Sequence, residues 1–317
     1  MPFYFGVTFL ALLIERIAGY PDMLTGSIGH PVQWMGALIS WLDARLNPES
    51  KPGSRVAGLA ALIFLLIVTG GLAVPAAILL HQLPYGWIVE AIIVTPFLAQ
   101  KSLRDHVRAV AEGLDGSLAL GRSAVSRIVG RDPDMLDRSG VARAALESLA
   151  ENASDGIVAP AFWLALLGLP GIVLYKAINT ADSMIGHKSP RYLNFGWAAA
   201  RLDDLVNLPA ARLTGMLFSI AALVRSPGSA KAAWVAMMRD AARHVSPNAG
   251  WPESSLAGAL GVTLGGARSY GGRYVDLATM GDGKNELDAN DIRNGLSLYG
   301  RALSLLTLFA LLLAWAF

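Results

Sequence analysis

The run from Val56 to Leu80 limits the possible folds more than any other segment, because its 25 residues carry no charge. A helix of about 20 apolar residues is long enough to cross the hydrocarbon core of a bilayer. The composition of the whole chain agrees, since 54% of the 317 residues are hydrophobic and only 16% are charged. A typical soluble domain is about 25% charged. The sequence therefore predicts an integral membrane protein.

Other apolar segments extend this prediction. The turn between the first two long runs has no Lys, Arg, Asp or Glu, whereas basic residues flank both of its legs, so we expect the legs to begin and end in the cytoplasm. The run after Gly156 is interrupted by Pro160 and by Gly168 to Gly171, which favours a broken or re-entrant helix. The further candidate segments are Phe3–Ala18, Trp87–Gln100, Gly156–Ile178, Leu205–Val224 and Ala302–Phe317.

We therefore expect an all-α, polytopic integral membrane protein with about four to six membrane helices. Cytoplasmic helical and loop insertions are expected at about residues 102–155 and 225–297, within a single membrane-embedded domain spanning residues 1–317. The N-terminal apolar segment has no basic region before it and no small-residue cleavage site, so it is interpreted as a retained helix.

Composition also excludes several classes of function. The net charge is only +2, without a long basic run, so nucleic acid is not an expected partner. The chain has no cysteine. Disulfides, cysteine-ligated zinc, iron–sulfur clusters and thiol nucleophiles are therefore excluded.

Three carboxylates precede the interrupted apolar run at a spacing of four residues, at Glu147, Glu151 and Asp155. On a regular helix they lie on one face and repel one another unless a cation lies between them. We call these three residues the acidic ladder and predict that they bind a divalent metal that carries phosphate. The alternative is helix capping by Ser154 or Asp155, because acidic residues are favoured near a helix N-terminus.

Two further polar groups follow the interrupted run. Asn179, Asp182 and Ser183 can share part of a helical face and offer oxygen ligands to Mg²⁺ or hydrogen bonds to a polar substrate; a cap and turn is the alternative. Next come Arg191 and Arg201, with Asp203 and Asp204. The arginines are predicted to bind phosphate or carboxylate and the aspartates to bind metal, although ordinary salt bridges would explain the same pattern.

The last polar group runs from Asp240 to Arg273. Its chemically versatile residues are Arg243, His244, Asn248, Glu253, Arg268 and Arg273. The density of proline and glycine predicts a structured loop instead of a helix, and Gly-Gly pairs allow backbone amides to approach an anion. The spacing and the lysine of a Walker A motif are absent. A plain surface loop is the alternative.

Four motifs, in this order, resemble the adenosylcobinamide-phosphate synthase family of vitamin B12 synthesis, called CobD or CbiB. The resemblance covers nearly the whole chain, from Glu15 to about Leu298. The N-terminal motif departs from the family pattern, because Tyr20 precedes Pro21 where an Asp is usual and Gln33 stands where an Arg is usual. The motifs are Glu147-Ser-Leu-Ala-Glu-Asn-Ala-Ser-Asp-Gly156, Asn179-Thr-Ala-Asp-Ser183, Phe195-Gly-Trp-Ala-Ala-Ala-Arg-Leu-Asp-Asp204 and Ser246-Pro-Asn-Ala-Gly-Trp-Pro-Glu253.

This resemblance implies an ATP-dependent amide ligation that joins adenosylcobyric acid to (R)-1-aminopropan-2-ol or its O-phosphate. ATP and Mg²⁺ are the implied cofactors. The implied setting is the bacterial inner membrane, with the active site facing the cytoplasm and the lipid bilayer as a partner. We also expect contact with other membrane enzymes of late cobalamin assembly and a homo-oligomer.

Within that reaction we infer three sets of roles for the residues named above. Arg201, His244 and Glu253 are expected to be catalytic, and either His244 or Glu253 takes the proton of the amine. The expected metal ligands are Glu147, Glu151, Asp155, Asp182, Asp203 and Asp204. The expected substrate- or phosphate-binding residues are Asn179, Ser183, Arg191, Arg201, Arg243, Asn248, Arg268 and Arg273.

Two other classes of function fit parts of the pattern. Polar residues within apolar segments and a broken helix are typical of a transporter or channel, here for a corrinoid or another polar solute. The long polar segments and the small number of spans argue against it. A membrane phosphotransferase is least favoured, because its Asp-x-x-Asp-Gly pattern with further spaced aspartates is absent.

Overall fold

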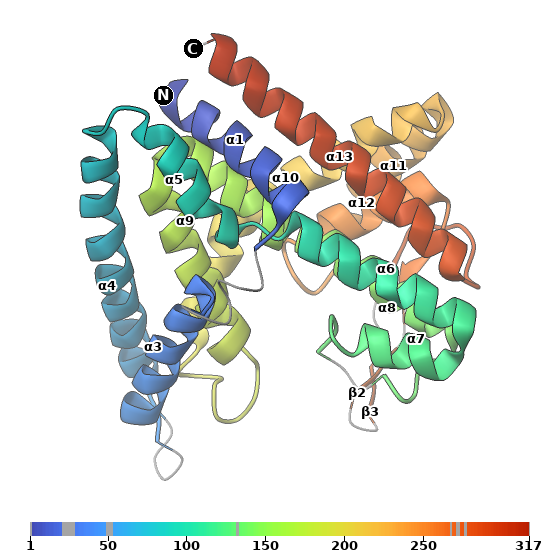
Figure 1. Ribbon diagram of the computed structural model, residues 1–317. Coiled ribbons are helices and arrows are strands. Elements are labelled where there is room, and N and C mark those ends of the chain that lie inside the picture. The colour runs from blue at the N-terminus through green and yellow to red at the C-terminus, as the bar shows by residue number, and fades with distance from the viewer. Residues whose placement is uncertain are drawn as a thin grey trace. The chain divides into compact units, whose positions relative to one another are not determined.

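The computed structural model describes residues 2–20, 29–48, 53–130, 133–266, 268–270, 273–275 and 278–316. The chain divides into two compact units. Unit 1 comprises residues 1–99, 159–207 and 309–317, and unit 2 comprises residues 100–158 and 208–308. Helices form nearly all of the regular structure, which confirms the all-α class (Figure 1). A single domain over the whole chain stays a prediction.

Unit 1 is built from apolar helices. Its core lies where α4 and α3 pack on α9 and where α1 packs on α5 and α9. The N-terminal part of α10 and the last residues of α13 also belong to it. The elements are α1 (Pro2–Ala18), α3 (Pro31–Leu46), α4 (Arg55–His81), α5 (Gly86–Val94), the 3₁₀-helix η1 (Thr95–Phe97), α9 (Ala159–Ile185), α10 (Trp197–Ala221) and α13 (Ala289–Ala316).

Helix α4 is the long apolar run predicted from the sequence. Ser54 is its N-cap and accepts a hydrogen bond from the Ala57 amide at 3.2 Å. Its 27 residues span about 40 Å at the rise of an α-helix. Within the described part of the chain, four helices are long and apolar enough to cross a membrane, which confirms the lower end of the predicted number. They are Arg55–His81, Arg138–Ile185, Trp197–Val224 and Ala289–Ala316.

The return leg after α4 differs from the prediction. Helix α5 ends at Val94 after nine residues, and the chain tightens into η1, which contains Pro96. Nine residues rise only about 14 Å, too little to span a bilayer. Proline has no N–H for the helix ladder and disfavours the helical conformation of the residue before it, so this leg ends early for a local reason.

Helix α9 is broken, as the sequence suggested, at Gly168 and not at Pro160. Gly168 has a φ of 65° and a ψ of −153°, which only glycine adopts easily. A Cβ at Gly168 would come within 2.3 Å of the Tyr4 ring. The break frees the Leu169 amide, and the buried Glu90 of α5 accepts its hydrogen bond at 2.8 Å. The other carboxylate oxygen of Glu90 lies 3.3 Å from Nε2 of His81.

The segment between α9 and α10 is held on α3 and α4. Arg191 pairs with Asp43 of α3 at 2.8 Å, and the Tyr192 hydroxyl donates to the same oxygen at 3.1 Å. At Gly58 of α4, a Cβ would lie 1.8 Å from the Phe195 carbonyl oxygen. This position therefore needs glycine.

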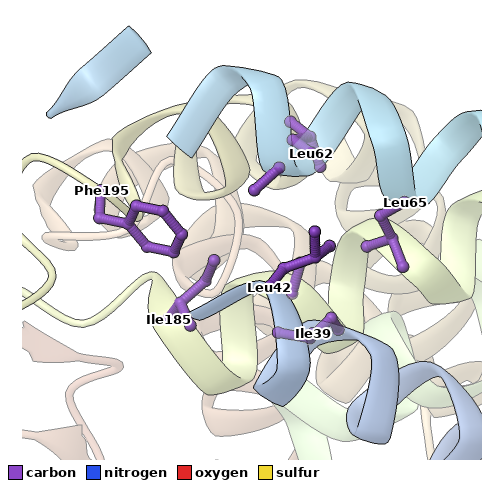
Figure 2. A pocket seen from close by; sticks show the side chains of 8 residues that line it. Ile39, Leu42, Leu62, Leu65, Ile185 and Phe195 are labelled. Carbon is purple, nitrogen blue, oxygen red and sulfur yellow. The ribbon is translucent and has the colours of Figure 1, made fainter. Parts of the chain in front are cut away.

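An apolar cavity lies beside this contact (Figure 2). Its volume of about 10 Å³ is at the lower limit for one water molecule, and its described lining offers no polar group to hold one. It is a packing gap in the core of unit 1 and not a ligand site. The labelled lining residues are Ile39, Leu42, Leu62, Leu65, Ile185 and Phe195.

Unit 2 contains the polar insertions. Helices α6 and α7 pack against each other and on α8, while α11 and α12 form a second packed pair with α12 on α8. Two short antiparallel pairs follow: β1 with β4, in which Leu264 faces Met280, and β2 with β3. Its elements are α6 (Gln100–Gly116), α7 (Leu118–Val125), α8 (Arg138–Ala153), the π-helix η2 (Ser154–Val158), the rest of α10, η3 (Ala222–Val224), α11 (Pro227–Asp240), η4 (Ala241–Arg243), α12 (Gly250–Leu260), β1 (Leu264–Gly265), β2 (Arg268–Tyr270), β3 (Arg273–Val275), β4 (Thr279–Met280) and most of α13.

The structured loop predicted from Asp240 to Arg273 is wrong between Gly250 and Leu260, where the chain forms α12. Pro252 lies in the first turn of this helix, where backbone N–H groups have no helical acceptor and proline costs little. Gly261 ends the helix with a φ of 69°, the usual role of glycine at a helix C-terminus. Glu253 is therefore held on a helix, not on a loop.

We predict that Glu90→Leu destabilises the protein more than Glu90→Gln. The Gln side chain keeps an oxygen that can accept from the Leu169 amide. The Leu variant leaves that amide unpaired in an apolar surrounding, at a cost of about 1–3 kcal/mol. Thermal unfolding of both variants in the same detergent measures the difference. Equal melting temperatures would show that the break in α9 does not need the carboxylate.

Candidate functional site

Asp240 ends α11 as a fully buried carboxylate. Arg239 donates to it from Nε at 2.8 Å and from Nη2 at 2.7 Å, and Arg243 donates from Nη1 at 3.2 Å. The Gly281 amide adds a fourth hydrogen bond at 2.9 Å. Burial favours the neutral acid, but the hydrogen bonds from Arg239 and Gly281 outweigh it and lower the pKa of Asp240. Asp240 is therefore an anion at neutral pH, and it joins α11, η4 and the segment after β4.

The two arginines that bind Asp240 differ in how many of their guanidinium nitrogens remain available to another partner. Arg239 uses Nε and Nη2 on Asp240 and its Nη1 on Asp282 at 2.8 Å. Arg243 is 56% exposed and touches Asp240 through Nη1. Across the described residues, its Nε and Nη2 have no other hydrogen bond or ion pair. Arg243 thus offers an oriented pair of donors to an anion, whereas Arg239 is structural.

The next residue, His244, is fixed by the turn that precedes α12. Its Nδ1 accepts from the Ser246 amide at 3.0 Å. The Ser246 hydroxyl in turn accepts from the amides of Asn248 and Ala249, both at 3.2 Å. The Nε2 atom of His244 lies 3.7 Å from Oε1 of Glu253, a carboxylate that is 3% exposed in the first turn of α12. Arg243, His244 and Glu253 are therefore brought together on one short segment.

The acidic ladder is not the single face that was predicted. Glu147 is buried and accepts from the Gly265 amide of β1 at 2.8 Å, while Glu151 is exposed. Helix α8 ends at Ala153, and the π-helix η2 shifts the register before Asp155. No group of three His, Asp or Glu side chains able to hold a metal ion occurs among the described residues. The ladder as a preformed three-ligand site is thus corrected.

Unit 1 holds a second polar cluster on α9 and α10. The Asp203 carboxylate accepts hydrogen bonds from the side-chain amide nitrogens of Asn179, at 3.3 Å, and Asn207, at 3.0 Å. Asn207 is itself oriented by the Tyr175 hydroxyl at 2.9 Å. Ser183 donates back to the Asn179 carbonyl at 2.9 Å. These contacts orient Asp203 among otherwise apolar side chains, where an unsatisfied carboxylate would be costly.

Two more aspartates lie near Asp203. The charges of Asp182 and Asp204 are close enough to act on Asp203 and on each other, and Arg201 lies 3.6 Å from Asp204. Carboxylate and amide oxygens are ligands that Mg²⁺ accepts, and Mg²⁺ usually takes only one or two carboxylates together with substrate phosphates. The donor types in this cluster fit a magnesium ion that arrives with a nucleotide.

Other predicted residues fall elsewhere. Arg191 forms the structural pair with Asp43 described above. Arg268 and Arg273 lie on β2 and β3, but their side chains lie outside the described residues. In the N-terminal motif, Pro21 also lies outside them, and Gln33 accepts from the His30 amide at 2.9 Å in a capping box at the start of α3.

Sequence reasoning gave no role to Asp240, Tyr175 or Asn207. The spacing of Asp240 and Arg243 is that of a helical salt bridge, so a local signal for that pair was present. No such signal exists for Tyr175 and Asn207, which are 32 residues apart.

We predict that Asp240→Asn lowers the free energy of unfolding at neutral pH by about 2 kcal/mol. The pKa of Asp240 is lowered in the folded state. The ionised carboxylate therefore stabilises the fold fully above the unfolded-state pKa of about 3.9. This stabilisation is lost as the pH falls through the folded-state pKa. Melting temperatures of both proteins between neutral pH and acid should converge on acidification. A difference that stays constant with pH would contradict this.

Comparison with known proteins places the chain in a family. A model of the family described as CobD/Cbib protein matches residues 8–299. A cobalamin biosynthesis protein CobD of a Sinorhizobium species is 51% identical over 315 residues, which cover 96% of each chain. Its namesakes from Rhodobacter capsulatus and Brucella suis biovar 1 are each 50% identical, over 94% of this chain and over 94% and 93% of their own length.

No solved structure matches this chain. The family match covers nearly the whole sequence and contains all four motifs that carried the resemblance. The chain belongs to the CobD/Cbib family of cobalamin biosynthesis.

Proposed function

We propose that this protein is an adenosylcobinamide-phosphate synthase. It would join a side-chain carboxylate of adenosylcobyric acid to the amine of (R)-1-aminopropan-2-ol or its O-phosphate, with ATP as the activating substrate. The observation that carries the proposal is the segment from Arg243 to Glu253, which combines an oriented cation with a half-buried histidine beside a buried glutamate. Family membership supports the pathway, and this segment supports the reaction type.

The reaction has two balanced steps. A carboxylate oxygen of the corrinoid attacks the γ-phosphorus of ATP, ADP leaves, and an acyl phosphate forms. The amine, after losing one proton, then attacks the carbonyl carbon, the C–O bond to phosphate breaks, and inorganic phosphate leaves with the electron pair. The products are one amide, ADP and phosphate, so the enzyme must bind a phosphoryl group, hold two substrates together and accept a proton.

Residues of unit 2 suit these tasks. Arg243 can bind a phosphoryl group with the two nitrogens that Asp240 leaves available. Asn248 lies at the start of α12, within the turn that Ser246 organises. Glu253 or His244 can take the proton of the amine. Arg268 and Arg273 stay candidates for phosphate binding from the sequence.

The metal would be held by carboxylates from one of two separate groups. In unit 1 these are Asp182, Asp203 and Asp204, with Arg201, Asn179 and Ser183 beside them; in unit 2 they are Glu151 and Asp155. Mg²⁺, when bound, neutralises phosphate oxygens and makes the γ-phosphorus easier to attack. The aspartates' mutual repulsion gives the unit 1 cluster an affinity for cations.

We further propose that the protein lies in the bacterial inner membrane with its reaction on the cytoplasmic side, where ATP is available. The four apolar helices support a membrane location. Basic residues before α4 support cytoplasmic placement of that end. Contacts with other membrane enzymes of cobalamin assembly and a homo-oligomer are part of the same proposal.

Purified protein in detergent tests the proposal when it is incubated with adenosylcobyric acid, MgATP and each form of the amine. We expect a corrinoid product heavier by the amine minus one water, with one ADP formed for each amide. The product mass identifies which amine is used. Vesicles that accumulate corrinoid without forming amide would instead support the transporter alternative.

We predict that Arg243→Lys lowers kcat by about tenfold or more, because lysine cannot grip a phosphoryl group bidentately. Arg239→Lys is the matched control. It removes the paired hydrogen bonds to Asp240 and should lower the melting temperature while kcat of the folded fraction stays near the wild-type value. Steady-state kinetics at saturating MgATP and thermal unfolding separate the two effects. Wild-type kcat in Arg243→Lys would remove Arg243 from phosphate binding.

A further inference from the structure

We infer that Glu253 is the base that deprotonates the amine, and that His244 is a positioning residue that donates a hydrogen bond to it. This inference rests on the proposed function and deepens it. The sequence leaves the two residues interchangeable as proton acceptors, since Glu253 ends the fourth family-like motif and His244 lies two residues before that motif begins. Their hydrogen bonds in the structure indicate which of the two can accept a proton from the amine.

The tautomer of His244 follows from its contact with the Ser246 amide. A backbone N–H can only donate, so Nδ1, which lies 3.0 Å from it, carries a lone pair. In the neutral ring the proton is then on Nε2. The Ser246 carbonyl lies 3.3 Å from the same Nδ1 and would accept from it only if Nδ1 carried the proton, so the shorter contact with the Ser246 amide is the one that assigns Nδ1 as the acceptor. Neutral His244 therefore has one nitrogen occupied and the other protonated, which leaves no lone pair for an incoming ammonium group.

Glu253 has the complementary properties. Its Oε1 lies 3.7 Å from the protonated Nε2 of His244, within reach of a hydrogen bond that shortens when the substrate binds. The Glu253 side chain is 4% exposed and lies in the first turn of α12. The geometry holds a carboxylate in a water-poor position with a neutral donor on one side.

The proton transfer is simple to balance. The substrate arrives as R–NH₃⁺, Glu253 accepts one proton and becomes a carboxylic acid, and R–NH₂ attacks the acyl phosphate. The remaining excess proton on nitrogen leaves with the departing phosphate. Arg243 is adjacent to His244, so the cation proposed for phosphate and the base proposed for the amine lie on the same segment.

The surrounding charges are accounted for by their own partners. On the elements that pack against α12, the charged groups with a described partner are Arg239, Asp240 and Arg243 at the end of α11 and in η4, Asp282 after β4, and Arg138, Arg143 and Glu147 on α8. Lys231 on α11 and Glu151 on α8 are exposed. Arg212 of α10 stacks on the Trp251 ring at 4.5 Å. Nε2 of His244 lies 3.7 Å from Oε1 of Glu253 and is the contact on which the positioning role is based.

The test uses two nucleophiles and three variants of the full-length protein. Hydroxylamine is largely unprotonated at neutral pH, so it traps an acyl phosphate as a hydroxamate without needing a base. Glu253→Gln keeps the size of the side chain but cannot take a proton. His244→Gln places an amide N–H near the position of Nε2, whereas His244→Asn places it near Nδ1 and removes the donor to Glu253.

With aminopropanol, Glu253→Gln should lose about 10²–10⁴-fold in kcat while hydroxamate forms at close to the wild-type rate. Its residual amide rate should rise with pH, because hydroxide then removes the proton of the amine. His244→Asn should move the acid limb of the pH–rate profile to higher pH, since a carboxylate without its donor holds protons more tightly. His244→Gln should restore the wild-type profile.

Several outcomes overturn the inference. Glu253→Gln with a wild-type amide rate shows that another group is the base, and loss of both amide and hydroxamate shows that Glu253 acts before the amine does. An unchanged pH profile in His244→Asn removes the positioning role. Wild-type protein that forms neither amide nor hydroxamate contradicts the proposed function itself, which keeps the two failures distinct. Thermal unfolding of each variant confirms that it is folded.

Discussion

The buried charge of Asp240 determines how the candidate site is built. A carboxylate without solvent contact must be satisfied by donors, and Arg239, Arg243 and the Gly281 amide supply them. These hydrogen bonds connect the end of α11, the 3₁₀ turn η4 and the chain after β4. Because η4 is fixed in this way, His244 and the turn organised by Ser246 begin from a defined position. The turn organised by Ser246 then sets where α12 starts and so fixes the position of Glu253 in its first helical turn.

The same requirement explains the polar contacts of unit 1. Its helices are apolar, so any backbone or side-chain group without a partner there is costly. Glu90 accepts from the amide freed by the break at Gly168, and Tyr175 and Asn207 orient Asp203. Each contact gives a hydrogen-bond partner to a polar group that an apolar surrounding would otherwise leave unsatisfied. The broken helix and the aspartate cluster are therefore stabilised by residues outside the motifs that drew attention to them.

Local patterns in the sequence were sufficient for the class of fold and for several helices. The charge-free run from Val56 to Leu80 is α4, and the break in α9 occurs within the Gly-Leu-Pro-Gly segment that the sequence marked. The prediction failed after Trp87 because Pro96 ends α5 early, and it failed at Gly250 because a proline in the first turn does not prevent a helix. Proline has opposite consequences at these two positions, which composition alone does not distinguish.

The candidate site was harder to predict, for a physical reason. The acidic ladder assumed an unbroken α-helical period, but η2 changes the period after Ala153, and Glu147 binds an amide 118 residues away. Such long-range contacts depend on how helices pack and leave no pattern in a single sequence. The segment around His244 and Glu253 was found because its residues are close in the chain, but the sequence could not show the hydrogen bond from the Ser246 amide to Nδ1 of His244, on which the distinction proposed between the two side chains is based.

Oxygen isotope transfer tests the proposed activation step most directly. When the corrinoid carboxylate carries ¹⁸O and is ligated by wild-type protein with MgATP, an acyl phosphate requires that one labelled oxygen leaves with inorganic phosphate. Mass spectrometry of the released phosphate should therefore show one ¹⁸O for each amide formed. Label in AMP would indicate an acyl adenylate, and amide formed with unlabelled phosphate and AMP would contradict activation of the carboxylate by ATP.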